Sequence, residues 1–415
     1  MLHLLVGLIA SAISLGRLYS ADQELLAELV WAEDGLFPLC VANHGYWNCL
    51  WDPYAGYLLF LSRTLAVPVA YTPLDSWPLT TNLVAAFSSG ALSALIFWLL
   101  IRIPIPRLAA AFSALVPVML PITGLEAINA AGSLYMVLLV ATTIAASANF
   151  HRPLPPWVLP SLLCVTALTI PLAILLAFPL AVRYLRKTIT VRQVLSAAGG
   201  LIAGSIVQLV VVLGAAGQRT VGANSASVIS WLDGTATAVV GLVGLRVELI
   251  ATDALNWSDS TFALPVGIGL TAAPLILGLW MLSRQSLEAP ALMILTGSLM
   301  SAATTVFSGN TNRYFVTSSA LIVISIVVAL SQSEIKSRQV SAAVVASALA
   351  GLWISHFPAS NLRATPEPIW SYMLEEARAR CAAESERVDV VLRFTPVWPP
   401  DEYDLTVLSQ DKVPC

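Results

Sequence analysis

The apolar segments of this chain are repeatedly long enough to cross a lipid bilayer, and this property constrains its fold more than any other. A helix needs roughly 20 apolar residues to cross a hydrocarbon core of about 30 Å. Of the 415 residues, 57% are hydrophobic and only 11% are charged. The runs do not alternate between apolar and polar residues as barrel strands do. The sequence therefore predicts an all-α, polytopic bundle of transmembrane helices.

About eleven spans are expected, at residues 2–19, 79–101, 108–123, 132–149, 157–170, 171–185, 194–214, 263–283, 290–307, 315–331 and 340–357. Residues 157–185 contain three prolines, and we interpret them as two helices that turn near residues 169–171. Residues 57–70 are apolar but are interrupted by Arg63 and Pro68. This stretch predicts an interfacial or re-entrant helix in the first outer loop.

The orientation follows from the basic residues. With the N-terminus inside, the inner loops contain ten of the 21 Lys and Arg residues but only Glu288 and Glu334 of the 24 acids. These ten are Arg102, Arg107, Arg152, Arg183, Arg186, Lys187, Arg192, Arg284, Lys336 and Arg338. The positive-inside rule therefore predicts an inner N-terminus and an outer C-terminus.

Two parts of unequal size are expected. Residues 1–357 form the transmembrane bundle, in which residues 20–78 make the first extracytoplasmic loop. Residues 358–415 form a small extracytoplasmic appendage, with a charged helix-like stretch at 370–387 and an alternating, strand-like stretch at 388–394. Because this appendage is too small for a catalytic domain, we expect the active site among the membrane helices and their outer loops.

The cysteines agree with this topology. Cys40 and Cys49 lie in the first outer loop, Cys381 and Cys415 lie in the outer tail, and Cys164 lies within a span. Two pairs in an oxidising compartment can form two disulfides, with three possible connectivities. A local Cys40–Cys49 bridge would brace the first loop, and four free thiols are the alternative.

The first outer loop carries the densest chemistry. Glu33 and Asp34 lie next to Trp31 and Phe37, and ionisable groups at a membrane boundary indicate a functional site. Carboxylates can deprotonate a hydroxyl group or hold a divalent cation such as Mg²⁺ or Mn²⁺, and aromatic rings can stack on sugars or anchor at the headgroups. The loop therefore predicts a carbohydrate site at the membrane surface, and a solvated loop is the alternative.

Other residues on the outer side could contact a substrate, and we predict His44, Trp51, Tyr57, Glu126, Asn129 and Tyr314. The sequence contains no cluster with zinc-ligand spacing, no serine-histidine-aspartate signature and no phosphate-binding loop. With a pI near 5.8 and no basic patch facing outward, nucleic acid is not an expected partner.

The plan of the chain, an N-in polytopic bundle with a carboxylate pair early in its first outer loop, resembles the C-type glycosyltransferase superfamily. Residues 31–37 and 54–63 also look like those of actinobacterial membrane proteins of that layout. The chain has Glu-Asp where many members have Asp-Glu or Asp-x-Asp. The resemblance implies a bacterial plasma-membrane glycosyltransferase, a hexosyl- or pentosyltransferase, whose donor is a polyprenyl-phosphate-linked sugar and whose acceptor is a cell-envelope glycan or glycolipid.

Such a reaction needs a base for the acceptor hydroxyl and a cation for the departing phosphate. We expect Asp34 as the base with Glu33 as its partner, and Arg313 as the phosphate ligand, with Arg63 and Arg246 as further candidates. A single base suits an inverting displacement at the extracytoplasmic face. Structural ion pairing with Asp52 or Asp75 is the alternative for Arg63.

Two other classes of protein remain open. A transporter or flippase of lipid-linked or small polar substrates would also be polytopic, but it should carry ionisable groups near the midplane, whereas the charges here cluster at the outer edge. A non-catalytic envelope-assembly protein is the other alternative. The loop that combines aromatic and acidic residues is the main argument against it.

Overall fold

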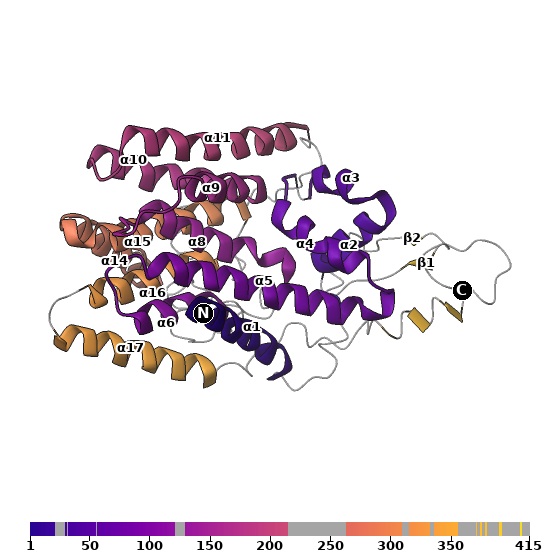
Figure 1. Cartoon of the computed structure of the whole chain (residues 1–415), viewed down its shortest axis with the longest axis horizontal. Helices are drawn as coiled ribbons and strands as arrows, with labels where there is room; N and C mark the ends of the chain where they lie inside the picture. The colour runs from indigo at the N-terminus through magenta and orange to yellow at the C-terminus, as the bar shows by residue number, and fades with distance from the viewer. Residues whose placement is uncertain are drawn as a thin grey trace.

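The computed structural model is a bundle of packed helices with a small strand pair in the tail (Figure 1). The structure describes residues 1–20, 30, 32–54, 56–120, 129–214, 263–308, 315–332 and 336–355, and in the tail residues 371, 374–375, 378–379, 390–391 and 407–408. Within these ranges the side chains of 19–20, 32–33, 263–268, 270–271, 305–308 and 336–338 are not described.

The first half of the bundle contains α1 (Leu2–Ser20), α2 (Ala32–His44), α3 (Tyr46–Trp51), α4 (Phe60–Ala70), α5 (Trp77–Leu100), α6 (Arg107–Met119), α8 (Tyr135–Ser147) and α9 (Val158–Thr169). The second half contains α10 (Ala177–Leu185), α11 (Val191–Gly214), α14 (Ala263–Leu282), α15 (Glu288–Ser308), α16 (Val316–Ser331) and α17 (Lys336–Ser355). Short 3₁₀ segments are η2 (Leu74–Ser76), η4 (Ala131–Ser133), η5 (Pro171–Leu176) and η9 (Gln285–Leu287).

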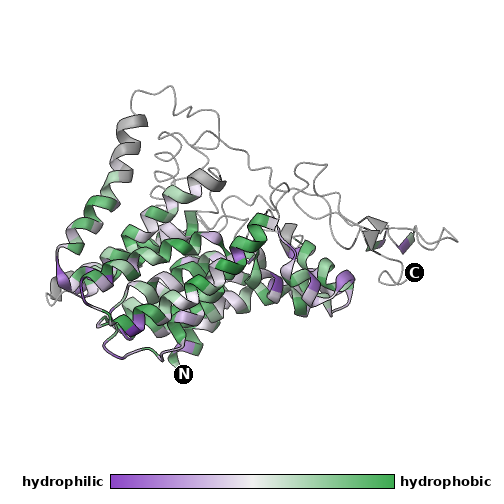
Figure 2. Cartoon of the chain, turned by 90° about the horizontal axis from the view of Figure 1, so that it is seen from above, coloured by the Kyte–Doolittle hydropathy of each residue, from purple (hydrophilic) through white to green (hydrophobic). Residues whose placement is uncertain are grey.

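The predicted helical architecture is confirmed, and each apolar run coincides with a helix to within a few residues. By length and composition, three of the helices in the described ranges could cross a membrane, namely Leu74–Leu100, Val191–Gly214 and Gln285–Thr304. The other apolar helices found there have 10–17 residues. Hydrophobic residues dominate the long helices, while hydrophilic ones gather at the connections (Figure 2).

The stretch with three prolines folds as the predicted hairpin. α9 ends at Thr169, Ile170 is extended with φ −150°, and η5 begins at Pro171. The chain then returns through α10, because Arg183 near the end of α10 lines the same cavity as Pro160 in the first turn of α9. At about 1.5 Å per residue, the 12 residues of α9 span about 18 Å. This length is short of a hydrocarbon core of about 30 Å.

Small residues allow helices to approach closely, as is common between membrane helices. α1 packs mainly on α5, and a Cβ on Gly90 would lie 2.5 Å from the carbonyl oxygen of Gly7. α11 packs mainly on α9, and a Cβ on Gly204 would lie 2.5 Å from the carbonyl oxygen of Cys164. Larger side chains at either glycine would push these helix pairs apart.

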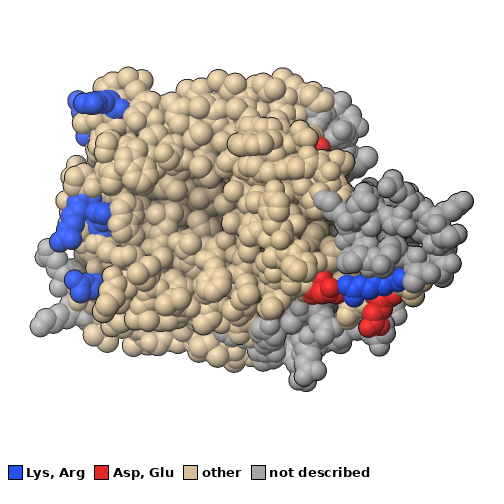
Figure 3. Space-filling view, turned by 45° about the vertical axis from the view of Figure 1, so that its right-hand side comes forward, with Lys and Arg blue, Asp and Glu red and all other residues tan. Residues whose placement is uncertain are grey.

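Charge divides the bundle into two ends: Figure 3 shows only basic residues at one end, and acidic residues together with one basic patch at the other. We call them the basic end, with Arg102, Arg107, Arg152, Arg183, Arg186, Lys187, Arg192 and Arg284, and the acidic end, with Asp34, Asp52, Asp75 and Glu375. Each group lies on connections or helix ends. The predicted excess of Lys and Arg at one end is therefore present in the described residues, while Arg17, Arg63 and Arg378 lie at the acidic end and Glu288 lies at the basic end.

The acidic end is covered by α2, α3 and α4, which pack on one another and which we call the cap. In the tail, β1 (Val390–Val391) lies within the strand-like stretch predicted at 388–394, and it pairs antiparallel with β2 (Val407–Leu408), which was not predicted. Leu374 is 1% exposed and packs with Val30, Leu39, Val69 and Trp77. The tail is thus anchored to the acidic end by a buried leucine.

Candidate functional site

The cap is fastened around Arg63, which lies on α4 and is 3% exposed. Its guanidinium donates to the carbonyl oxygen of Cys49 at 2.6 Å and to Oδ2 of Asp52 at 3.4 Å. It also lies over the ring of Phe37, with Cζ 4.8 Å from the ring centroid. Phe37 in turn makes an edge-to-face contact with Tyr54 at 5.4 Å. Arg63 therefore links α2 and α3 to α4.

The electrostatics of Arg63 agree with this role. Desolvation lowers the pKa of Arg63 from its ordinary value, and the charge of Asp52 opposes the shift. Its two terminal nitrogens are hydrogen-bonded to Cys49 and Asp52. Its Nε is buried without a hydrogen-bond partner in the described part of the chain. The ion pair with Asp52 that we kept as an alternative is thus present.

The predicted disulfide between Cys40 and Cys49 is present, with their Cα atoms 5.8 Å apart. It joins α2 to α3, and Cys49 is the residue whose carbonyl oxygen accepts from Arg63. Cys164 is a free, half-buried thiol. A covalent bond and a buried arginine therefore brace the same corner of the cap.

Residues 129–133, which we call the hub turn, connect four helices at the acidic end. Asn129 adopts a left-handed conformation with φ 52°, which asparagine tolerates better than most residues. Its side chain accepts from Oγ of Ser14 on α1 at 3.1 Å and donates to Oδ1 of Asn82 on α5 at 2.9 Å. Oγ of Ser62 on α4 donates to the carbonyl oxygen of Gly132 at 3.3 Å. The hub turn is thus held from α1, α4 and α5.

Asp34 supplies the fourth attachment, from α2. It is 4% exposed, and its carboxylate accepts from the backbone N–H of Ala131 at 3.1 Å and of Gly132 at 2.7 Å. Two amide donors stabilise the ionised form and fix its orientation. The structure therefore brings together two residues predicted for the site, Asp34 and Asn129.

Arg17 was not predicted, although it is a buried cation at the same end. It is 4% exposed and donates to the carbonyl oxygens of Val118 at 2.6 Å and Leu120 at 3.2 Å, where α6 ends. It lies three residues after Ser14 on α1, so both side chains share one face of that helix. An arginine inside an apolar run is costly and indicates function or structural pairing, and this signal could have identified it.

A small cavity lies inside this cluster. Its volume is about 20 Å³, and Ser14, Ser89, Asn129 and Ser133 supply its polar wall. This is close to the space one water molecule occupies. The hydroxyl groups and the amide provide the polar partners that such a water requires.

The other predicted residues of the cap lie nearer to solvent. His44 is exposed at the end of α2, and Trp51 is 48% exposed on α3, one turn after Trp47, which is 69% exposed. Tyr57 is half-buried and exchanges both backbone hydrogen bonds with Tyr54. α3 therefore presents two indole rings outward, as expected of residues that contact a headgroup region or a sugar.

The remaining predicted residues lie outside the described residues, namely Glu126, Arg246, Arg313, Tyr314, Cys381 and Cys415. Glu33 lies on α2, but its side chain is not described. Among the described residues, no group of three or more His, Cys, Asp or Glu side chains is placed to hold a metal ion.

No protein-family model matches the chain, and a search of the curated proteins gives no match. The fold itself defines the class: a helical protein in which three of the described helices are long and apolar enough to cross a membrane.

Proposed function

We propose that the protein is a membrane glycosyltransferase that acts at the acidic end of the bundle. It transfers one sugar from a polyprenyl-phosphate donor to a cell-envelope glycan or glycolipid. The observation that carries the proposal is the placement of Asp34, a buried carboxylate that two backbone amides hold in one orientation beside a polar cluster. Rigid positioning of a carboxylate in an apolar bundle is what a catalytic base requires.

The topology that belongs to this proposal has the basic end in the cytoplasm and the acidic end outside a bacterial plasma membrane. The accumulation of Lys and Arg at one end supports it. The Cys40–Cys49 disulfide in the cap supports an oxidising compartment at the other end. About eleven spans are part of the same proposal, in which α9 and the η5–α10 segment count as two short ones, since α9 alone extends only about 18 Å.

The reaction is an inverting displacement. The acceptor hydroxyl oxygen attacks the anomeric carbon of the donor, and its proton passes to Asp34 or Glu33. The bond between the anomeric carbon and the phosphate oxygen breaks, and polyprenyl phosphate leaves with the electron pair. Arg313 neutralises this phosphate, since a guanidinium binds a phosphate through two parallel hydrogen bonds. In this scheme Arg63 positions the cap, because its guanidinium already binds Cys49 and Asp52.

The test uses the full chain, purified with its native lipids and supplied with a panel of polyprenyl-phosphate sugars. Wild type should consume one donor and release polyprenyl phosphate. Comparing Glu33→Gln with Asp34→Asn should identify the base, because the variant that lacks the general base should lose about 10²–10⁴-fold in turnover. The other variant should lose less. The matched control is Asp75→Asn, an exposed acid at the same end that pairs with Arg378. If wild type consumes none of the donors, the proposal is overturned. If Asp34→Asn retains full turnover, Asp34 is not the base.

Stability must be measured beside turnover, because Asp34 also holds the hub turn. Arg313→Gln provides an independent reading, because in this scheme Arg313 binds the donor phosphate. It should lower turnover and weaken donor binding without moving the unfolding midpoint. Removal of divalent cations with EDTA, followed by Mg²⁺ or Mn²⁺, tests whether Glu33 and Asp34 hold a metal.

Sidedness has its own test. Cysteine replaces Asp75 at the acidic end or Lys187 at the basic end, both of which are exposed. In intact cells a membrane-impermeant maleimide should label Asp75→Cys above the parent protein, and should label Lys187→Cys only after permeabilisation. The reverse pattern would place Asp34 on the cytoplasmic face and contradict the proposal.

A further inference from the structure

A cavity with two charged side chains in its wall lies at the opposite end of the bundle from Asp34. It has a volume of about 470 Å³ and lies between the start of α9, the end of α10 and the first turns of α11. Phe150, Leu154, Leu159 and Ile189 supply much of its apolar wall. A cavity of this size lies within the range of small-molecule sites, about 300–1,000 Å³.

The charged groups in this wall are both arginines, Arg183 and Arg192. No acid lines the cavity in the described part of the chain. Its ligand therefore has to be anionic at one part and apolar at another. A free phosphate would leave the apolar wall unused, and an uncharged lipid would leave the two cations uncompensated.

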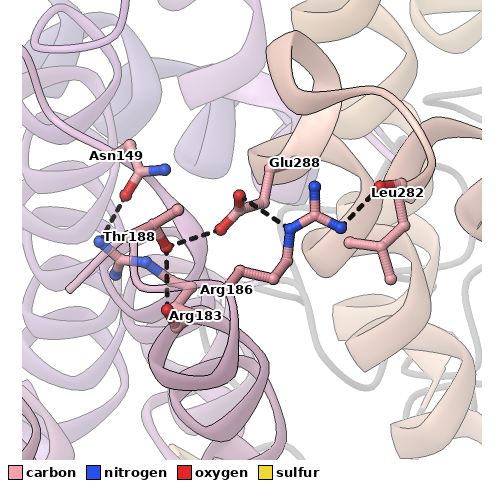
Figure 4. A network of polar contacts seen from close by, with 6 residues as sticks. All are labelled: Asn149, Arg183, Arg186, Thr188, Leu282 and Glu288. Atoms are coloured by element: carbon pink, nitrogen blue, oxygen red, sulfur yellow. Dashed lines mark hydrogen bonds and ion pairs between the residues drawn. The ribbon is translucent and has the colours of Figure 1, made fainter.

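Arg183 is a buried cation held in a fixed orientation in the wall of this cavity. It is 6% exposed, and one terminal nitrogen donates to the carbonyl oxygen of Ala146 at 2.8 Å. The other donates to Oδ1 of Asn149 at 2.8 Å (Figure 4). Its Nε is buried without a hydrogen-bond partner in the described ranges. These two hydrogen bonds therefore fix the guanidinium in the wall of the cavity.

The nearest described acid does not neutralise both arginines. Glu288 acts on Arg183 electrostatically, but it pairs directly with Nε of Arg186 at 3.3 Å and accepts from Oγ1 of Thr188 at 2.8 Å (Figure 4). Arg192 is exposed and has no ion pair among the described residues. Positive charge therefore remains at this cavity.

The cavity also lies where lipid can reach it. α11 is one of the helices long enough to cross a membrane, and it packs on α9 at the outside of the bundle (Figure 1). Several of its apolar side chains are more than half exposed, including Leu195, Ile202, Ile206 and Leu209. Arg192 lies in the first turn of the same helix, at the level where headgroups meet the hydrocarbon.

We propose that this cavity binds one anionic phospholipid from the leaflet at the basic end, with its phosphate at Arg183 and Arg192 and an acyl chain along Phe150, Leu154 and Leu159. The proposal rests on the cavity and its charges, and it does not depend on the transferase reaction. A bound anionic lipid would contact both the start of α9 and the first turns of α11, and would thereby stabilise the α9–η5–α10 hairpin.

The test is native mass spectrometry of the delipidated full chain, titrated with phosphatidylglycerol, phosphatidylcholine or inorganic phosphate. Wild type should retain one phosphatidylglycerol in preference to phosphatidylcholine. Arg192→Gln should weaken this binding about tenfold, the effect of losing one charge-assisted contact. Ser196→Trp, which fills the cavity from α11 and keeps both arginines, should abolish it.

The matched control is Arg284→Gln, an exposed arginine at the same end that lies over Trp280 and outside the cavity. It should bind phosphatidylglycerol as wild type does. Equal binding by Arg192→Gln and wild type overturns the proposal. Equal retention of phosphatidylcholine, or inorganic phosphate that binds as tightly as phosphatidylglycerol with the same dependence on Arg192, overturns it in favour of a different ligand.

Discussion

The two ends of the bundle each contain a buried carboxylate, and they hold it in different ways. At the acidic end, Asp34 accepts from the backbone amides of Ala131 and Gly132. At the basic end, Glu288 accepts from Thr188 and pairs with Arg186, which also donates to the carbonyl oxygen of Leu282. One carboxylate is fixed by main chain and the other by side chains.

This difference has mechanical consequences. Backbone amides cannot rotate away, so Asp34 and the hub turn fix one another in position. Arginine side chains have several rotatable bonds and carry more conformational entropy, so the network at the basic end can rearrange when one member is lost. The acidic end should therefore be the more sensitive to single substitutions, and the basic end should be the more tolerant.

Loss of the Asp34 carboxylate should have the largest effect on stability. Asp34→Ala leaves the amides of Ala131 and Gly132 without their acceptor, and each unsatisfied buried donor costs about 1–3 kcal/mol. We expect a loss of about 3 kcal/mol, measured as a lower denaturant midpoint in detergent micelles. An unchanged midpoint would show that the hub turn does not depend on Asp34, and would remove the contrast between the ends.

The disulfide should come next, because it braces the cap at the same end. Cys40 and Cys49 are nine residues apart, and closing a loop of about ten residues stabilises a fold by about 2.5 kcal/mol in the chain-entropy relation. The double variant Cys40→Ser with Cys49→Ser should lose about this amount. Dithiothreitol should lower the wild-type midpoint equally and leave the double variant unchanged, and a further loss in that variant would place the effect elsewhere.

The sequence predicted the helices well because apolar runs are set by local composition. Every predicted run coincides with a helix, the turn at Ile170 falls in the predicted hairpin, and the Cys40–Cys49 bridge follows from two cysteines in one short loop. The helix lengths were less predictable, since α9 and α10 end where the hairpin turns. Their ends depend on packing against α8 and α11, which composition does not encode.

The partners of polar groups could not be predicted in this way. Asp34 was singled out because acids are rare here, but its bonds to residues 131 and 132 join positions about 97 apart in sequence. For Arg63, a further candidate to bind phosphate, the alternative of an ion pair with Asp52 is confirmed, but its contacts with Cys49 and Phe37 depend on how α2, α3 and α4 pack. The loop motifs do not point to Arg17 or Asn82, because both residues lie inside apolar helices.

Loss of charge at Glu288 should have a smaller effect than loss of Asp34. Glu288→Gln keeps an acceptor for Thr188 and removes the charge that faces Arg186, whose side chain is 30% exposed. Because solvent screens a pair with one partly exposed member, we expect a loss of about 1 kcal/mol. The difference from wild type should shrink in 1 M salt, and a loss as large as that of Asp34→Ala would contradict the tolerance of the basic end.

The smallest effect on stability should come from substitution of Asp75. Like Asp34 it is an acid at the acidic end, but it is exposed, so it shows how much charge contributes there without burial. Its two oxygens accept from Arg378 at 2.8 and 2.9 Å, but the side chains are 62% and 38% exposed. Exposed pairs contribute about 0–1 kcal/mol, so Asp75→Asn should change the unfolding midpoint very little.

Leu374→Ala, in the same tail as Arg378 and 1% exposed, should cost about 2–3 kcal/mol of tail docking. Protease cleavage between residues 356 and 370 would report that docking, and greater cleavage in Asp75→Asn than in Leu374→Ala would show that the ion pair holds the tail.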